Sequence, residues 1–230
     1  MAVAVRATLA LRAGVQRAGI PRLSTIHTMP DRLAQEIAAT AARLVVDEGM
    51  EYAGAKRKAL RALGPRAARQ SQMPSNESVE DEVRDYLALF CADTQPAELL
   101  ALRQLALVWM DRLAEFRPHL AGAVWRGTAT RLSALHLDLY CDDTKSTEIA
   151  LINRGIDYDV GSRPDRQGGQ VDMLSIAAPC KALGETVTLF LTILDHDDQR
   201  GALKPDARGR SWRGDASALR RLLDEPGGLP

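Results

Sequence analysis

The chain has 230 residues, of which 46% are hydrophobic and 26% are charged, as is usual for a globular protein with a buried core. Its 30 basic and 30 acidic residues cancel, so no overall positive field favours nucleic acid as a partner. No stretch approaches the roughly 20 apolar residues of a membrane-spanning helix. We therefore expect a cytoplasmic protein that does not enter the membrane.

The first 28 residues differ in composition from the remainder. They contain no acidic residue and four arginines, Arg6, Arg12, Arg17 and Arg22. These arginines interrupt every apolar stretch that a secretory signal would need, although an organelle transit peptide has a similar composition. Because Met29 directly precedes the first strong helical pattern, we interpret residues 1–28 as an unstructured extension or a mis-assigned start.

The three cysteines, Cys91, Cys141 and Cys180, are far apart in the sequence and form no Cys-x-x-Cys pair. This spacing indicates neither a disulfide framework nor a zinc site. We expect them to be isolated, buried thiols.

Apolar residues recur at helical spacing through the first half of the chain. A Pro-Asp start, two glycines and Pro118 mark the ends of these segments, and Asn76 is placed to cap the third helix. The expected helices cover residues 31–49, 51–63, 76–90 and 94–117, with a loop over 65–78. We therefore predict a helical region over 29–117.

Short segments rich in β-branched residues follow Pro118 and are bounded by Gly, Pro and Asp. The expected strands cover residues 121–126, 135–141, 156–161, 171–177 and 186–194, and the expected helices cover 145–153 and 215–223. This order predicts an α/β domain of the α+β kind over 118–230, in which helices flank a small mixed sheet.

The most informative motif lies between residues 122 and 140. A Gly127-Thr128 turn is followed by Ser133 and then by a strand that carries His136 and Asp138. This order resembles the nucleotidyltransferase (polymerase-beta-like) superfamily, in which a Gly-Ser or Gly-Thr turn precedes a strand with two acids one residue apart. A third acid lies on a later strand of that family, and Asp172 is the candidate here.

The resemblance implies transfer of a nucleotidyl group from a nucleoside triphosphate, with Mg²⁺ held by Asp138 and Asp172. Gly127, Thr128 and Ser133 would contact the phosphates, and His136 would replace an acid or position the acceptor. In one alignment the paired acids fall at Ala134 and His136, and in another at His136 and Asp138, so the acidic motif is eroded.

The alternative to transfer is an inactive nucleotide-binding or protein-interaction module, with the helical half as the surface for a protein partner. Each candidate also has a plainer interpretation. Gly127-Thr128 is equally a simple turn, His136 a hydrogen-bonded sheet residue, and Asp172 a solvent-facing side chain on an alternating strand. The cluster Asp195-His196-Asp197-Asp198 favours a turn over a metal site.

The strongest charge feature is a basic run without acids: Lys56, Arg57, Lys58, Arg61, Arg66 and Arg69. It could bind phosphate groups, but no aromatic residues interleave it as in a nucleic-acid interface. The favoured interpretation is a solvated face that packs near the acidic segment 77–85. The sequence has no P-loop, no Gly-x-Gly-x-x-Gly, no Gly-x-Ser-x-Gly and no His-Glu-x-x-His motif.

Overall fold

The computed structural model describes residues 29–65, 69, 72–141, 143–164, 169–199, 205–206 and 208–224. The predictions for residues 1–28 and for Arg66 therefore lie outside the described residues. None of the helices that the structure describes is both long and apolar enough to cross a membrane.

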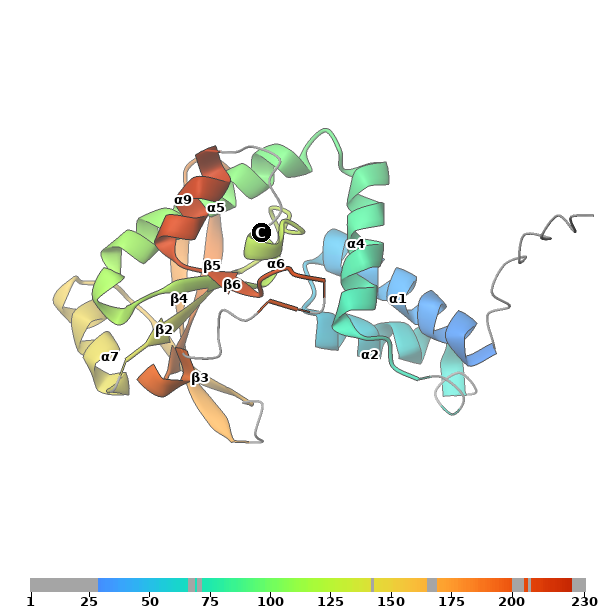
Figure 1. The fold of residues 1–230 in the computed structure, drawn as a ribbon, viewed down its shortest axis with the longest axis horizontal. Coiled ribbons are helices and arrows are strands. Elements are labelled where there is room, and N and C mark those ends of the chain that lie inside the picture. Colours follow the sequence, from blue (N-terminus) through green and yellow to red (C-terminus); the bar gives the residue numbers. More distant parts are fainter. Residues whose placement is uncertain are drawn as a thin grey trace, which may run out of the picture.

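Three helices form a small unit of their own at the right of Figure 1: α1 (Met29–Glu48), α2 (Tyr52–Ala62) and α4 (Asn76–Phe90). Their facing sides meet in a core that is separate from the core of the sheet. Its completely buried members are Ile37, Ala41, Ala55, Ala59, Val79 and Val83. The helical spacing read from the sequence therefore predicted all three helices correctly.

The predicted cap of α4 is displaced by one residue. Ser75, not Asn76, is the N-cap, because its hydroxyl oxygen accepts a hydrogen bond from the Ser78 N–H at 3.0 Å. Asn76 is the first helical residue, and its Oδ1 accepts from Lys56 Nζ at 2.8 Å. Either residue type suits this position, so the sequence alone did not distinguish them.

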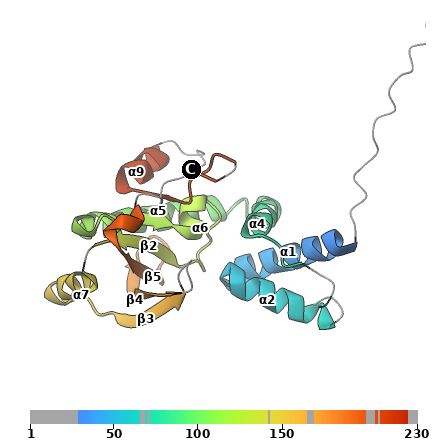
Figure 2. The same ribbon diagram turned by 60° about the horizontal axis from the view of Figure 1, so that its bottom comes forward.

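The long helix α5 (Gln95–Arg112) packs on the sheet, although the sequence grouped it with the helical half. Its buried side includes Leu102, Ala106, Trp109 and Met110, and a 3-10 turn, η1 (Ala114–Phe116), follows it. The C-terminal helix α9 (Ala216–Asp224) lies beside α5 in both views (Figures 1 and 2). One side of the sheet is thus covered by a helix from the middle of the chain and by the last described helix.

The sheet has six strands in the order β3-β4-β5-β2-β1-β6. Only the central pair β2–β5 is parallel, and the other neighbours are antiparallel. The strands are β1 (His119–Ala121), β2 (Leu135–Tyr140), β3 (Asp159–Pro164), β4 (Gln170–Cys180), β5 (Glu185–Leu194) and β6 (Arg213–Gly214). The short helix α6 (Gly122–Arg126) follows β1, α7 (Thr144–Asn153) follows β2, and a 3-10 turn, η2 (His196–Asp198), follows β5. This arrangement confirms the expected α+β class with a mixed sheet.

Two of the predicted strands need correction. Residues 122–126 form α6 and not a strand, because Gly122 (φ 70°) turns the chain after β1 and Gly127 (φ 78°) ends the helix. Both glycines adopt the left-handed conformation that other residues avoid. The strand expected at 156–161 begins later, at Asp159, because Gly155 (φ 63°) first turns the chain out of α7.

The two sides of the sheet differ sharply in chemistry because alternate residues of a strand point to opposite faces. We call one side the apolar face, which carries Leu135, Leu137 and Leu139 of β2 and packs against α5. We call the other side the polar face. Its members in register across the strands are His119, His136, Asp138, Tyr140, Met173, Phe190, Thr192, Gly161, Arg163 and Arg213.

Candidate functional site

Asp138 lies at the centre of the polar face and is only 2% exposed. In register it faces His119 on β1 and Thr192 on β5. Two arginines from distant segments converge on it: Arg213 Nη1 is 2.8 Å from Oδ2, and Arg163 Nη2 is 3.7 Å from Oδ1. We call Asp138, Tyr140, Arg163 and Arg213 the arginine site.

Tyr140 completes the arginine site. Its phenol oxygen accepts a hydrogen bond from Arg213 Nη1 at 2.6 Å, and its ring meets His119 edge to face. Burial raises the pKa of the Tyr140 phenol above its ordinary value, although Arg213 opposes that shift. The hydroxyl therefore stays protonated at neutral pH and retains a proton to donate.

Within its own four residues the arginine site carries more positive than negative charge, although the Glu51 carboxylate interacts electrostatically with Arg163 from outside it. Asp138 contributes one negative charge, and Arg163 and Arg213 contribute two positive charges that are permanent at neutral pH. The Nε–H groups of both arginines are buried and have no hydrogen-bond partner among the described residues. An anion with several acceptor oxygens is the kind of group that would satisfy them.

Asp172 does not join Asp138. Its neighbour Met173 pairs with Thr192 and so shares the face of Asp138, which places Asp172 on the opposite face, where it is exposed. Among the described residues, no group of three His, Cys, Asp or Glu side chains is close enough to hold a metal ion. The donor set at Asp138 does not fit the two-metal chemistry that the resemblance implies, because its carboxylate is already engaged by arginine.

The Gly127-Thr128 turn ends α6, and its N–H groups are occupied. Both N–H groups donate to the carbonyl oxygen of Ala123, at 2.9 Å in the case of Thr128. Side chains cap the carbonyl groups around the turn: Gln95 Nε2 donates to Gly127 O and Ala129 O, and Arg103 donates to Val124 O and Trp125 O. The turn therefore presents no free N–H to a phosphate and works as a helix C-cap.

Ser133 closes the next turn, because its hydroxyl oxygen accepts from the Thr130 N–H at 3.0 Å. His136, two residues before Asp138, points to the same face. Its Nε2 lies 3.2 Å from Glu51 Oε1, and its ring stacks on Phe190 with centroids 5.2 Å apart. The hydrogen bond from His136 lowers the pKa of Glu51.

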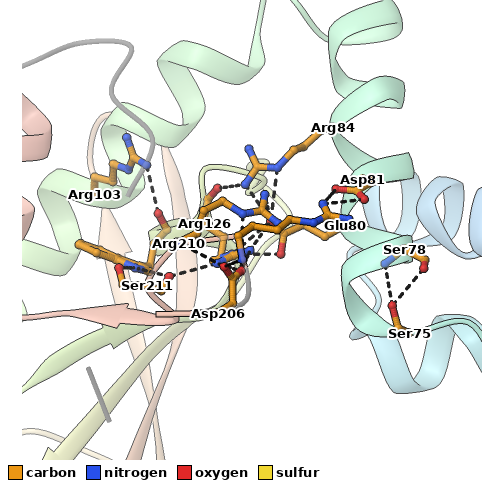
Figure 3. Close-up of polar contacts among 12 residues, drawn as sticks. Ser75, Ser78, Glu80, Asp81, Arg84, Arg103, Arg126, Asp206, Arg210 and Ser211 are labelled. Carbon is orange, nitrogen blue, oxygen red and sulfur yellow. Dashed lines mark hydrogen bonds and ion pairs between the residues drawn. The ribbon is translucent and has the colours of Figure 1, made fainter. Parts of the chain in front are cut away.

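We call α1, α2 and α4 the helical unit, and the sheet with the helices that pack on it the sheet unit. A buried ion network, which we call the seam network, joins the two units (Figure 3). At its centre Arg126 donates to both oxygens of Glu80 through Nε, at 3.1 and 3.0 Å. Arg84 and Arg210 also contact Glu80, and Asp206 contacts Arg126 at 3.4 Å. Glu80 and Arg126 are 1% and 3% exposed, so removing one partner would leave an uncompensated buried charge between the two units.

A cavity of about 140 Å³, which we call the seam pocket, lies beside this network. Glu80 and Arg126 line it, together with residues from both units. The aromatic lining residues are Tyr52, His136 and Trp212, and further polar lining residues are Glu51, Asn76 and Ser133. His136 belongs both to this pocket and to the polar face, and on β2 it lies two residues before Asp138 of the arginine site.

Among the described residues, the basic run, the acidic turn at 195–198 and the three cysteines take part in local structural contacts or in none that indicate a site. In the basic run, Lys58 pairs with Glu48 of α1 and Lys56 donates to Pro74 O and Asn76 Oδ1. In η2, the Asp195 side chain accepts from the Asp197 N–H, as expected for a turn. The three cysteines are free thiols, of which only Cys180 is buried.

Sequence reasoning missed Arg163, Arg213, Glu51 and Trp212. None of them belongs to a motif, and they lie far from residues 122–140 in the chain. A partial signal was available at Arg213 alone, because an arginine next to a tryptophan, Trp212, is costly to bury without a partner. Only the sheet register brings them to Asp138.

A scan against protein-family models found no match for this chain, and a search of curated proteins found none either.

Proposed function

We propose that the protein binds a nucleotide on the polar face of its sheet and does not transfer it. The observation that carries this proposal is the arginine site, in which two guanidinium groups converge on a single carboxylate. A phosphate chain offers acceptor oxygens and negative charge to such a pair.

Arg163 is the residue that would engage the ligand first. Its side chain is 43% exposed, whereas that of Arg213 is 15% exposed and already donates to Tyr140. Arg163 Nη2 also lies 3.7 Å from the Asp138 carboxylate, beyond hydrogen-bond distance. An incoming phosphate can therefore recruit Arg163 while Arg213 stays on Asp138.

Binding without transfer is favoured over catalysis because, in the part of the chain that the structure describes, Asp138 belongs to no group of three His, Cys, Asp or Glu side chains that could hold a metal ion. Two-metal nucleotidyl transfer needs carboxylates that clamp both ions next to the triphosphate. Here the one central carboxylate neutralises arginine, and the ligand charge would be met by guanidinium groups. The nucleotide should accordingly bind without a divalent metal ion.

Isothermal titration of ATP, GTP, CTP and UTP, in magnesium and in EDTA, tests the proposal. We expect affinity to persist in EDTA and to fall about tenfold or more in Arg163→Gln, which loses a charge-assisted hydrogen bond. Arg154→Gln is the matched control, because Arg154, the C-cap of α7, has a similar side-chain exposure of 39%. Asp138→Asn should retain binding; a strict need for magnesium and for Asp138 would instead indicate the transferase.

A second candidate function is protein binding through the helical half. Leu89 and Phe90 at the end of α4 are 75% and 69% exposed, which is unusual for neighbouring large apolar residues. A photo-cross-linking residue introduced at position 90 should then become cross-linked to a protein partner. The same residue at position 92, which is also exposed, should not. Equal trapping at both positions would count against this function.

A further inference from the structure

The seam pocket has the size of one aromatic ring system. Its volume is about 140 Å³, and an engineered protein cavity of about 150 Å³ holds benzene. Unlike that apolar cavity, the seam pocket is lined by both aromatic and polar side chains. A planar, polar heterocycle is the ligand that matches both features.

The aromatic lining residues of the pocket come from three separate segments of the chain. Tyr52 starts α2, His136 lies on β2, and Trp212 directly precedes β6. Two of the three rings contact a neighbouring side chain: Trp212 lies against the Arg126 guanidinium at 4.5 Å, and His136 stacks on Phe190. Planar bases gain affinity from such aromatic platforms by stacking.

Two polar lining residues of the pocket, Glu51 and Asn76, offer hydrogen-bonding groups of opposite kind. Glu51 uses Oε1 for His136, and its Oε2 makes no hydrogen bond among the described residues. The hydrogen bond from His136 keeps Glu51 ionised, so it is an acceptor only. Asn76 uses Oδ1 for Lys56, which leaves its Nδ2 group as a donor. An exocyclic amine beside a ring nitrogen, as in adenine and cytosine, presents the complementary donor and acceptor.

The pocket also lies at a suitable distance from the arginine site. His136 and Asp138 are alternate residues of one strand, so their Cα atoms are about 6.6 Å apart. A base in the pocket would thus direct its ribose and phosphates along β2 towards Arg163 and Arg213.

We propose that the seam pocket is the base subsite of the nucleotide site and selects an amino-substituted nucleobase. This inference rests on the proposed function for the phosphate end of the ligand. Because the pocket is formed by both units, a bound base bridges the helical unit and the sheet unit.

Pairs of nucleosides that differ only in the amine test the specificity. In isothermal titration, cytidine should bind about tenfold more tightly than uridine, and adenosine more tightly than inosine by a similar factor, the effect of one hydrogen bond to a charged group. Glu51→Gln should bring each pair to nearly equal affinity. Equal affinities in the unaltered protein would overturn the assignment of an amine-selective pocket.

A pocket-filling variant tests the location. Ala134 is half-buried and lines the pocket, so Ala134→Leu should weaken nucleosides and nucleotides about tenfold or more by occupying their space. Ala92→Leu, at an exposed alanine between α4 and α5, is the control. Unchanged nucleotide affinity in Ala134→Leu would overturn the subsite.

Inorganic tripolyphosphate separates failure of the subsite from failure of the proposed function. It should bind the unaltered protein and Ala134→Leu equally and should weaken in Arg163→Gln. If tripolyphosphate binds but nucleosides do not, the base subsite is wrong and the phosphate site stands. If neither tripolyphosphate nor any nucleotide binds, the proposed function fails and the subsite fails with it.

Discussion

On β2, the residues Leu135, Leu137 and Leu139 point to one face of the sheet, and His136, Asp138 and Tyr140 point to the other. Both sets are largely buried, yet only the leucines gain free energy simply by leaving water. Asp138 costs free energy unless arginines compensate its charge. The fold could be built without these polar residues, so we look for function on the face that carries them.

The largest effect should come from the apolar face. Leu137 is completely buried between the sheet and α5, so Leu137→Ala should lower the free energy of unfolding by about 2–5 kcal/mol through lost burial and a residual cavity. Thr188→Ala, exposed on the polar side of β5, should stay within about 0.5 kcal/mol. Urea denaturation of both variants measures the difference. Similar losses of unfolding free energy in the two variants would mean that the apolar face does not contribute more to stability than the polar face.

A matched pair of glycines tests the same division by adding a single methyl group. A Cβ at Gly214, on the apolar side of β6, would overlap the buried indole ring of Trp125 at Cη2. A Cβ at Gly161, on the polar side of β3, would have no contact closer than 3.7 Å. Gly214→Ala should therefore lose about 1–3 kcal/mol of stability by overpacking, whereas Gly161→Ala should be nearly neutral.

Thermal denaturation followed by circular dichroism compares the two glycine variants directly. A neutral Gly214→Ala would show that Trp125 moves easily. In that case its hydrogen bonds to Ser211 O and Oγ, both 3.1 Å, would not fix the ring under β6.

On the polar face, the contribution of a single hydrogen bond can be isolated at Tyr140. Tyr140→Phe removes the acceptor of the 2.6 Å hydrogen bond from Arg213 and should cost about 1 kcal/mol. Tyr86→Phe is the control, because the Tyr86 hydroxyl bonds to Asp47 at the surface and its loss should be smaller. Chemical denaturation gives both values. An equal loss in the two variants would place the Tyr140 hydroxyl in contact with water.

Much of the fold could be predicted from the sequence because its periodicity is strong. The helical spacing of α1 and the alternation in β2 each follow from one continuous segment. The failure at 122–126 has a local cause: alternation over a few residues does not separate a strand from a short helix, and the outcome depends on the left-handed glycines at 122 and 127.

The candidate site was less accessible to prediction because its geometry depends on pairing between strands. His136 and Asp138 share a face by alternation alone, and the sequence predicted that. Whether Asp172 joins them depends on the register of β4 against β5, and a shift of one residue would reverse its side. Arg163 and Arg213 reach Asp138 only because β3 and β6, the two edges of the sheet, bring them there.

The smallest predicted effect concerns the contact between the polar face and the helical unit, through His136 and Glu51. The hydrogen bond from His136 lowers the pKa of Glu51, with a further contribution from the charge of Arg163. Ionised Glu51 therefore stabilises the folded state above the ordinary glutamate pKa of about 4.3, and this contribution is lost as the pH falls through the lowered value.

Glu51→Gln should consequently lose about 0.2–1 kcal/mol of stability at pH 5.5 and nothing at pH 3, a small effect because the Glu51 side chain is 73% exposed. Glu36→Gln, at an exposed position of α1, should show no such dependence on pH. Urea denaturation at both pH values measures the two differences. A loss that persists at pH 3 would mean that Glu51 acts by packing and not by charge, and the polar face would then join the helical unit through the seam network alone.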